Sequence, residues 1–184
     1  MNIQCLEGEV WKEIPSLKGA FLASNFARIY STQRQVEYKN KNGTIVKRWT
    51  KGGLVSIMLH PSGYLVCTMG HATKMKVHRL VCEAFHGMPN GKQVVNHING
   101  DKADNRPENL EWTSNRDNCM HYFSKKENGL PAGIYFHPTR QRFQGSMMYN
   151  GKRHFIGDHK NLEDAITAYR QKELSLGMEA SRYF

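Results

Sequence analysis

One stripe of apolar residues in the middle of the chain has the spacing of a helix. Apolar side chains recur at intervals of three and four residues from Val77 to Phe85, which places them on one face of an α-helix. Gly87 and Pro89 follow, and both disfavour continuation of a helix. The pattern therefore predicts a helix that begins near Val77 and stops before Gly87. His78 lies off the apolar stripe, so it is expected at the helix surface or beside a site.

The residues before this helix predict short strands and turns. Asn42-Gly43 lies between two stretches of strand composition and is a strong signal for a hairpin turn. Further turns are expected at Gly52-Gly53 and at 61–63, and 63–69 has the composition of a strand. Residues 1–70 are therefore expected to form a small β-rich module.

A second hairpin is expected after the helix. Residues 93–95 and 110–112 have strand composition, and a long polar loop joins them. Thr113 or Ser114 can then cap a helix that runs towards Lys126. These elements predict a strand, loop, strand and helix unit within residues 71–127.

The last third of the chain predicts a sheet and one more helix. It follows a stretch of linker composition at 128–131, and strands are expected at 133–137, 142–149 and 152–156. Asn150-Gly151 suits a two-residue hairpin turn. A final helix is expected from Asn161 as N-cap to near Gly177. Residues 128–184 therefore predict a three-stranded sheet with a helix.

The charge of the chain indicates an acidic partner. The net charge is +10, and it is unevenly distributed. Residues 28–79 hold ten basic side chains and one acidic side chain, whereas residues 80–129 hold six basic and seven acidic ones. From residue 130 onward there are eight basic and five acidic side chains. A basic segment on each side of a neutral middle favours two separate binding surfaces for a polyanion. The middle segment would then hold a site that needs carboxylates or a metal.

Composition excludes several classes of protein. Hydrophobic residues make up 39% and charged residues 23%, which favours a globular chain over a disordered one. The apolar runs are too short for a transmembrane helix or a signal peptide. The four cysteines form no CxxC pair, which disfavours a disulfide framework or a cysteine zinc site. A reducing cytoplasm is the expected location.

A dense motif occupies the second predicted hairpin. From Val94 to Trp112 it reads VVNHINGDKADNRPENLEW, and Asn118 follows on the predicted helix. With these residues, the stretch 77–121 resembles the His-Asn-His (HNH) nuclease family, in the branch whose third position is asparagine. The resemblance implies a ββα-metal core that hydrolyses DNA phosphodiesters with one divalent cation, Mg²⁺ or Mn²⁺. It also implies 5′-phosphate and 3′-hydroxyl ends and a phage or mobile-intron origin.

The motif assigns roles to four side chains. Imidazole has a pKa that suits activation of water near neutral pH, so His97 is the predicted general base. Asn109 on the opposing strand is expected to reach across the hairpin and hold the ring of His97. Side-chain oxygens of Asn96 and Asn118 are the predicted metal ligands, and the resemblance implies that they come together.

Asn96 is a departure from the family, because many relatives have aspartate there. A neutral amide binds Mg²⁺ more weakly than a carboxylate. Three alternatives follow: an enzyme with weaker metal affinity, a contribution from Asp101 or Asp104, or a binding protein that no longer cuts. An active enzyme is favoured, since His97, Asn109 and Asn118 are all present.

The C-terminal segment resembles the plant ethylene-response-factor DNA-binding domain over about 50 residues. That family places a three-stranded antiparallel sheet in the major groove and backs it with a helix. Independently, alternation gives each predicted strand one apolar face and one face suited to base edges and phosphates. The predicted DNA-binding side chains are Tyr135, His137, Arg142, Gln144, Ser146 and Arg153.

The N-terminal segment also resembles a known module. Residues 9–14 and 23–31 are similar to the small module that precedes HNH motifs in intron-encoded endonucleases, where a glycine usually stands at the position of Ala27. Basic side chains of this segment are expected to follow phosphates. They include Lys47, Arg48 and Lys51.

The predicted architecture is a modular α+β protein with boundaries at 1–70, 71–127 and 128–184. Its predicted function is a site-selective, homing-type endonuclease that nicks double-stranded DNA as a monomer. The first alternative is a catalytically weak or inactive DNA-binding regulator on an HNH scaffold. A weaker alternative is an RNA-binding or RNA-processing protein.

Overall fold

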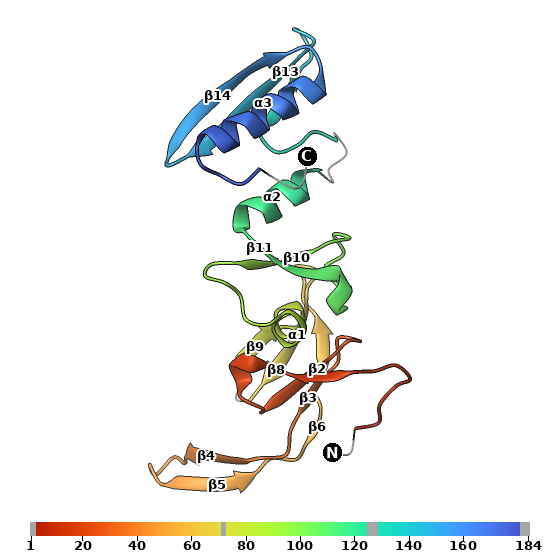
Figure 1. Cartoon of the computed structure of the whole chain (residues 1–184). Coiled ribbons are helices and arrows are strands. Elements are labelled where there is room, and N and C mark those ends of the chain that lie inside the picture. Colours follow the sequence, from red (N-terminus) through yellow and green to blue (C-terminus); the bar gives the residue numbers. More distant parts are fainter. Residues whose placement is uncertain (1–2, 71–72, 125–128, 181–184) are drawn as a thin grey trace. The chain divides into compact units, whose positions relative to one another are not determined.

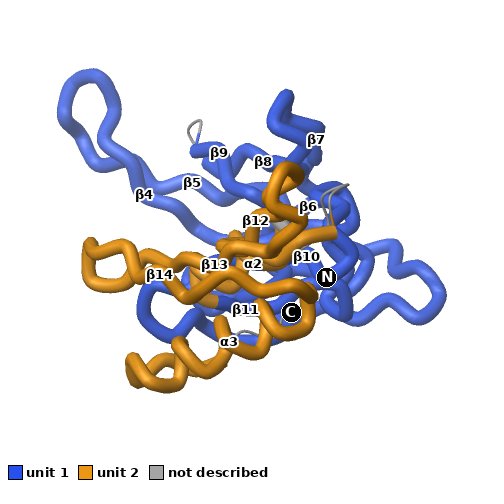
Figure 2. Tube along the Cα trace, turned by 90° about the horizontal axis from the view of Figure 1, so that it is seen from above, with its two compact units in different colours: residues 1–113 blue, residues 114–184 orange. Residues whose placement is uncertain are grey.

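The computed structural model describes residues 3–70, 73–124 and 129–180. Its backbone forms two compact units, residues 1–113 and residues 114–184, which Figure 2 colours separately. Small sheets and short helices alternate along the chain, as Figure 1 shows. The predicted α+β, modular fold class is confirmed. The predicted linker residue Asn128 and the end of the second helix lie outside the described residues.

The first sheet of the N-terminal unit has the strand order β1-β2-β3-β6. Its strands pair antiparallel and span Trp11–Glu13, Phe21–Ser24, Ile29–Ser31 and Gly53–Leu54. A 3-10 helix, η1 (Pro15–Leu17), joins the first two strands. Ala27 in the turn between β2 and β3 has a φ of 58°, the left-handed region where glycine is the favoured residue. The turn keeps this conformation because Ser24 Oγ accepts hydrogen bonds from the backbone of Phe26 and Arg28.

A separate hairpin extends from this sheet. It pairs β4 (Gln35–Lys39) with β5 (Ile45–Trp49), and Gly43 in its loop has a φ of 78°. The Asn42-Gly43 hairpin prediction is therefore confirmed. Most side chains of both strands are exposed, so the hairpin buries little of its own surface.

A third sheet and the first helix complete the core of this unit. The sheet pairs β7 (Ile57–Leu59), β8 (Leu65–Met69) and β9 (Thr73–Lys76). Helix α1 (Val77–His86) follows at once and ends at Gly87, as predicted. Its apolar stripe is buried in the core with residues from β2, β3 and β8. Strand β9 was not predicted, because its sequence TKMK has no apolar alternation.

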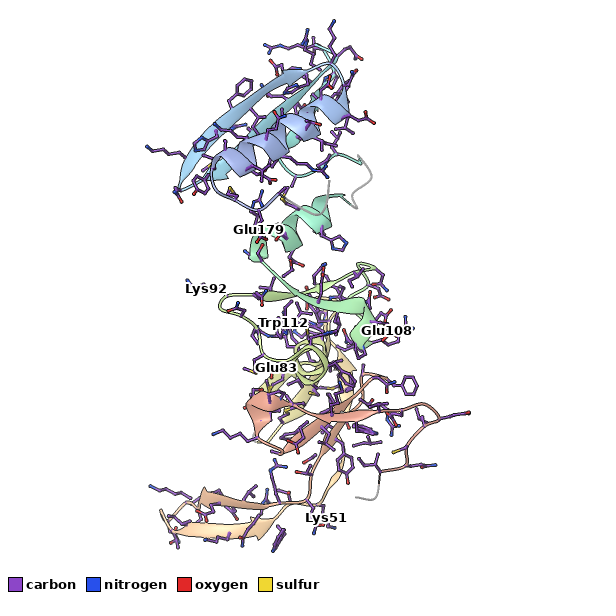
Figure 3. All side chains as sticks on the ribbon, in the orientation of Figure 1. Lys51, Glu83, Lys92, Glu108, Trp112 and Glu179 are labelled. Atoms are coloured by element: carbon purple, nitrogen blue, oxygen red, sulfur yellow. The ribbon has the colours of Figure 1, made fainter. Side chains whose placement is uncertain are left out.

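The second hairpin pairs β10 (Val94–His97) with β11 (Leu110–Thr113) in the register Asn96↔Glu111 and His97↔Leu110. A 3-10 helix, η2 (Pro107–Asn109), leads into β11. Trp112 lies beside α1 (Figure 3), and its indole N–H donates to the carbonyl of Gly87 at 2.9 Å. The tryptophan therefore packs the hairpin against the helix.

The C-terminal unit begins with helix α2 (Asn115–Ser124). Ser114 is its cap, because Ser114 Oγ accepts a hydrogen bond from the backbone of Asp117 at 3.0 Å, whereas Thr113 belongs to β11. The sheet β12-β13-β14 follows, with strands Ile134–His137, Arg142–Tyr149 and Lys152–His159, and helix α3 spans Leu162–Ser175. Strand β14 is three residues longer than the predicted 152–156.

The core of this unit lies between the sheet and two helices. Ile134 and Met147 from the sheet are buried with Met120 of α2 and with Ala165 and Tyr169 of α3. Helix α2 is therefore anchored in the C-terminal unit by Met120.

Two glycines of this sheet have close neighbours. A Cβ on Gly133 would meet the ring of Tyr169 at 2.7 Å, and a Cβ on Gly145 would meet Ile156 Cβ at 3.1 Å. Close approach of α3 to the sheet therefore depends on Gly133, whereas the neighbour of Gly145 is Ile156 of β14.

An ion pair also joins α2 to α3. Glu173 is fully buried, and its carboxylate accepts a hydrogen bond from the guanidinium of Arg116. The burial of Glu173 is compensated by an arginine that comes from a different helix.

Candidate active site

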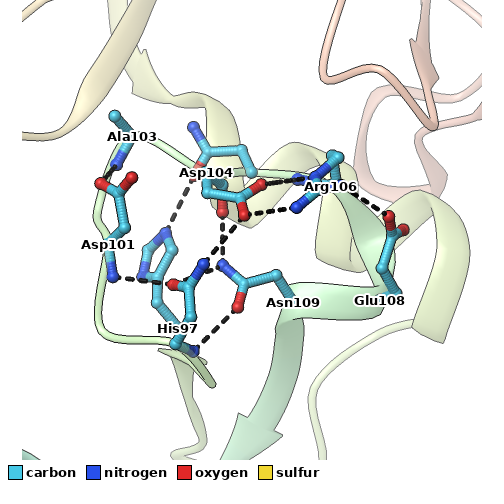
Figure 4. A network of polar contacts seen from close by, with 9 residues as sticks. His97, Asp101, Ala103, Asp104, Arg106, Glu108 and Asn109 are labelled. Carbon is cyan, nitrogen blue, oxygen red and sulfur yellow. Dashed lines mark hydrogen bonds and ion pairs between the residues drawn. The ribbon is translucent and has the colours of Figure 1, made fainter.

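The end of the β10–β11 hairpin and its loop hold most of the predicted catalytic residues. His97 is the last residue of β10, and Asn109 is the last residue of η2. Both side chains are buried, with exposed fractions of 7% each. Figure 4 shows the polar network that surrounds them.

The ring of His97 has a hydrogen-bond partner that the sequence did not reveal. Its Nε2 lies 2.9 Å from Oδ1 of Asn105, in the middle of the loop. Asn105 is only 1% exposed, and its Nδ2 has no hydrogen-bond partner in the described part of the chain. Burial lowers the pKa of His97 below its ordinary value of 6.5. The ring is therefore held in one orientation and is neutral at neutral pH.

The other side of the His97 ring is packed against aromatic rings. The ring centroid of His78 is 5.0 Å away and that of Tyr64 is 6.1 Å away. Two ammonium groups, of Lys76 and Lys102, lie 4.3 and 4.9 Å from the centroid of Tyr64, within cation–π range. On this side, the ring of His97 lies beside the ring of His78, and the positive charges of Lys76 and Lys102 lie over Tyr64.

His78 is buried and not on the surface. Its side chain is 5% exposed, and its Nδ1 has no hydrogen-bond partner among the described residues. Burial, followed by the positive charge of nearby groups, lowers the pKa of His78 to about 3. The helix pattern alone did not predict this, because the rings that contact His78 are those of Tyr64, just before β8, and His97 of β10.

Asn109 holds the loop and not the ring of His97. Its Oδ1 accepts from the backbone N–H of Asn99 at 2.9 Å. Its Nδ2 donates to Asn99 Oδ1 at 3.0 Å and to the carbonyl of Asp104 at 2.7 Å. The expected direct contact with His97 is replaced, because the loop folds back and brings Asn105 to the ring. Asn109 therefore supports His97 through the loop that carries Asn105.

The two loop aspartates are committed to the loop itself. Asp101 accepts a hydrogen bond from the backbone of Ala103. The carboxylate of Asp104 binds the guanidinium of Arg106 through two hydrogen bonds of 2.9 and 2.8 Å. Arg106 lowers the pKa of Asp104 to about 2. Among the described residues, no group of three or more His, Cys, Asp or Glu side chains is placed to hold a metal ion, so neither aspartate belongs to such a group.

Asn96 has a different partner from His97. The amide nitrogen of Asn96 donates to Oε1 of Glu111 at 2.9 Å, across the β10–β11 ladder. Asn96 is 3% exposed, and Glu111 is partly buried. The sequence alone did not predict this pair, because the register that places Asn96 opposite Glu111 depends on how the loop between the two strands folds.

Asn118 lies on α2 in the C-terminal unit. Its role as a metal ligand stays a prediction.

The predicted DNA-reading face of the C-terminal sheet is partly exposed. Tyr135 is 59% exposed, and Arg153 is exposed and donates to Ser146 Oγ at 3.1 Å. His137, Arg142 and Gln144 are partly buried. Two apolar side chains that the prediction did not include, Met148 and Phe155, are 65% and 61% exposed.

The predicted basic side chains of the N-terminal module lie on and after the β4–β5 hairpin. Lys47 pairs with Glu37 at 2.8 Å, and Arg48 lies 5.5 Å from the ring centroid of Tyr38. Lys51 follows β5 at the foot of the hairpin (Figure 3) and is exposed. The side chains of Lys47, Arg48 and Lys51 are therefore all exposed to solvent, on the hairpin or directly after it.

Two segments of the chain match known family models. Residues 75–120, which include the β10–β11 hairpin, match the model described as HNH endonuclease. Residues 9–70 match the NUMOD4 motif. The predicted HNH resemblance is therefore confirmed over the second hairpin and the helices that flank it.

Two viral proteins share this sequence over part of their length. The chain is 39% identical over 120 residues to "Uncharacterized HNH endonuclease L247" of Acanthamoeba polyphaga mimivirus. This alignment covers 62% of this chain and 26% of that protein. It is 33% identical over 96 residues to "Uncharacterized HNH endonuclease L245" of the same virus, which covers 50% of this chain and 28% of that protein. The chain thus spans about a quarter of the length of these relatives.

A solved structure described as "DNA binding and cleavage by the HNH homing endonuclease I-HmuI" is 19% identical and aligns with a TM-score of 0.48. The alignment covers 91% of this chain and 90% of that one. Among the described residues, no helix is long and apolar enough to cross a membrane.

Proposed function

We propose that this protein is a metal-dependent HNH endonuclease that nicks double-stranded DNA at selected sites and leaves 5′-phosphate and 3′-hydroxyl ends. The observation that carries the proposal is the buried, neutral His97, held by Asn105 at the end of β10 within the segment that matches the HNH model. A neutral imidazole in a fixed orientation is what a general base requires.

The hydrogen bond to Asn105 selects the atom of His97 that takes the proton. A carboxamide oxygen can only accept, so Nε2 carries the ring hydrogen when it lies 2.9 Å from Asn105 Oδ1. Nδ1 then keeps the lone pair that can remove a proton from water. Asn109 maintains this arrangement by binding the backbone of the loop at Asn99 and Asp104.

A divalent cation fits the oxygen donors of the site. Mg²⁺ prefers oxygen ligands and keeps several waters, so that one or two protein ligands suffice. Asn96 is one proposed ligand, and Asn118 on α2 is the other. A bound Mg²⁺ or Mn²⁺ would stabilise the charge that develops on the phosphate and on the leaving 3′ oxygen.

DNA binding is assigned to both ends of the chain. The β4–β5 hairpin presents Lys47, Arg48 and Lys51 for phosphate contacts. The exposed face of the C-terminal sheet presents the predicted reading side chains, which combine hydrogen-bonding groups with apolar ones suited to thymine methyl groups. These side chains are Tyr135, His137, Arg142, Gln144, Ser146 and Arg153, together with Met148 and Phe155.

The test is incubation of the full chain with supercoiled DNA in Mg²⁺, in Mn²⁺ and in EDTA. We expect open-circular product before linear product, no product in EDTA, and at least a hundredfold loss of rate in His97→Ala with DNA affinity retained. His60→Gln, on the exposed β7–β8 turn, is the matched control and should cut normally. Tight binding without cleavage in either metal would instead favour the alternative, a regulator on an HNH scaffold.

A further inference from the structure

The pairing of Asn96 with Glu111 has a consequence for the metal site. A carboxylate accepts hydrogen bonds and cannot donate them, so the atom of Asn96 that lies 2.9 Å from Glu111 Oε1 must be the amide nitrogen. The orientation of the Asn96 amide is thereby fixed. Its oxygen, which is the only metal-binding atom of that side chain, occupies the branch directed away from Glu111.

We propose that Glu111 completes the metal site by supplying the negative charge that Asn96 lacks and by holding the Asn96 oxygen in position for the cation. The inference rests on the proposed metal-dependent function. It gives Glu111, on the strand that faces Asn96, a role that the sequence motif did not assign to it.

Geometry supports the assignment. Asn96 and Glu111 are directly opposite in the antiparallel ladder, so their side chains project from the same face of the hairpin. Asn96 would hold the cation through its amide oxygen, and Glu111 would supply negative charge beside it, through one of the waters that Mg²⁺ retains. Asn96 is 3% exposed and Glu111 is partly buried, so solvent screens the charge of the Glu111 carboxylate less than that of an exposed one.

The other nearby carboxylates are less suited to this task. Asp104 is bound by two guanidinium nitrogens of Arg106 and by the amide of Asn99. Asp101 caps the loop backbone at Ala103. Glu108 is exposed and lies 3.6 Å from Arg106. Of these acidic side chains, Glu111 is the one with a hydrogen bond to a predicted ligand.

The experiment measures Mn²⁺ binding to the full chain through the loss of the free-ion signal in electron paramagnetic resonance. Glu111→Gln preserves the shape of the side chain and removes its charge. We expect a 10- to 100-fold weaker Mn²⁺ affinity, roughly the effect of removing a group that supports a metal ligand. Glu108→Gln is the matched control and should change the affinity less than twofold. In nicking assays, Glu111→Gln should need correspondingly more Mn²⁺ for half-maximal rate.

Restoring the charge on the other strand provides the reciprocal test. Asn96→Asp in the Glu111→Gln background should recover Mn²⁺ affinity, because one carboxylate is again present in the pair. Asn96→Asp alone should lower the melting temperature without metal, since two carboxylates then face each other, and added Mn²⁺ should raise it more than in the parent. This variant keeps the test decisive if Glu111→Gln does not fold.

The outcomes separate the two proposals. If the parent nicks DNA in Mn²⁺ and Glu111→Gln binds Mn²⁺ as tightly as the parent, the role of Glu111 is refuted and the proposed function stands. If the parent neither nicks DNA nor binds Mn²⁺, the proposed function fails and the role of Glu111 fails with it. An unchanged melting temperature of Asn96→Asp, with and without Mn²⁺, would also overturn the role of Glu111.

Discussion

The ring of His78 meets the ring of His97 edge-on, with centroids 5.0 Å apart and ring planes inclined at 83°. His78 comes from the first turn of α1 and His97 from the end of β10. The predicted general base is therefore packed against a second buried imidazole from an element that lies outside the hairpin. This contact couples the stability of the N-terminal unit to pH.

His78 makes the protein less stable as the pH falls below neutral. Its pKa is about 3 in the folded chain and about 6.5 when unfolded, so the unfolded state binds more protons between these values. Stability is fully present above pH 6.5 and falls as the pH drops towards 3, at a rate approaching about 1.4 kcal/mol per pH unit. His97, whose pKa is also lowered, adds to the loss in the same direction.

Urea unfolding at pH 7, 6 and 5 measures this effect. His78→Phe should reduce the pH dependence of the unfolding free energy of the N-terminal unit by about half, because one of the two buried imidazoles described in that unit is removed. His60→Gln, which removes an exposed histidine, should leave it unchanged. An unaltered pH dependence in His78→Phe would contradict the assignment.

Asn105 is expected to act as a positioning residue for His97. Asn105→Ala removes the hydrogen bond to Nε2, so the ring can rotate and the single-turnover nicking rate should fall by about tenfold. DNA affinity should be unchanged, since Asn105 is buried and cannot contact DNA directly. Asn90→Ala, at an exposed position before β10, is the control. Equal losses of rate and of affinity would indicate general unfolding of the loop instead.

The Arg116–Glu173 pair should be a strong determinant of stability in the C-terminal unit. Arg116→Ala removes the guanidinium that pairs with the fully buried carboxylate of Glu173, and breaking a buried ion pair in this way costs about 3–5 kcal/mol. Hydrogen exchange of the α3 amides should accelerate accordingly, whereas exposed Glu163→Ala should have little effect. Unchanged exchange in Arg116→Ala would show that the pair contributes nothing to the docking of α3.

The basic hairpin should determine much of the salt dependence of DNA binding. Replacing Lys47, Arg48 and Lys51 by alanine should lower affinity and reduce the slope of log K against log salt by about 2–3, close to 0.9 per lost phosphate contact. Fluorescence anisotropy between 50 and 200 mM salt, about the range over which such contacts weaken, measures both quantities. Glu37→Gln, which releases Lys47 from its ion pair, should raise affinity slightly. A slope unchanged by the triple substitution would place the phosphate contacts elsewhere.

Local elements and the central motif could be predicted from the amino-acid sequence alone. Helix α1, the two Asn-Gly hairpins and the strands β10 and β13 follow from apolar periodicity and turn residues within about ten neighbouring positions. His97 and Asn109 could be selected because their spacing belongs to a family pattern that residues 75–120 match.

Contacts between side chains that are distant in the sequence became known only from the folded structure. The burial of His78 depends on Tyr64 from the β7–β8 hairpin, and the contact of Asn105 with His97 depends on the path of a long loop. The pairing of Asn96 with Glu111 needs the register of β10 on β11. The burial of Glu173 needs the arginine of another helix. Each of these contacts joins residues that are distant in sequence, and local propensity contains no information about such distances.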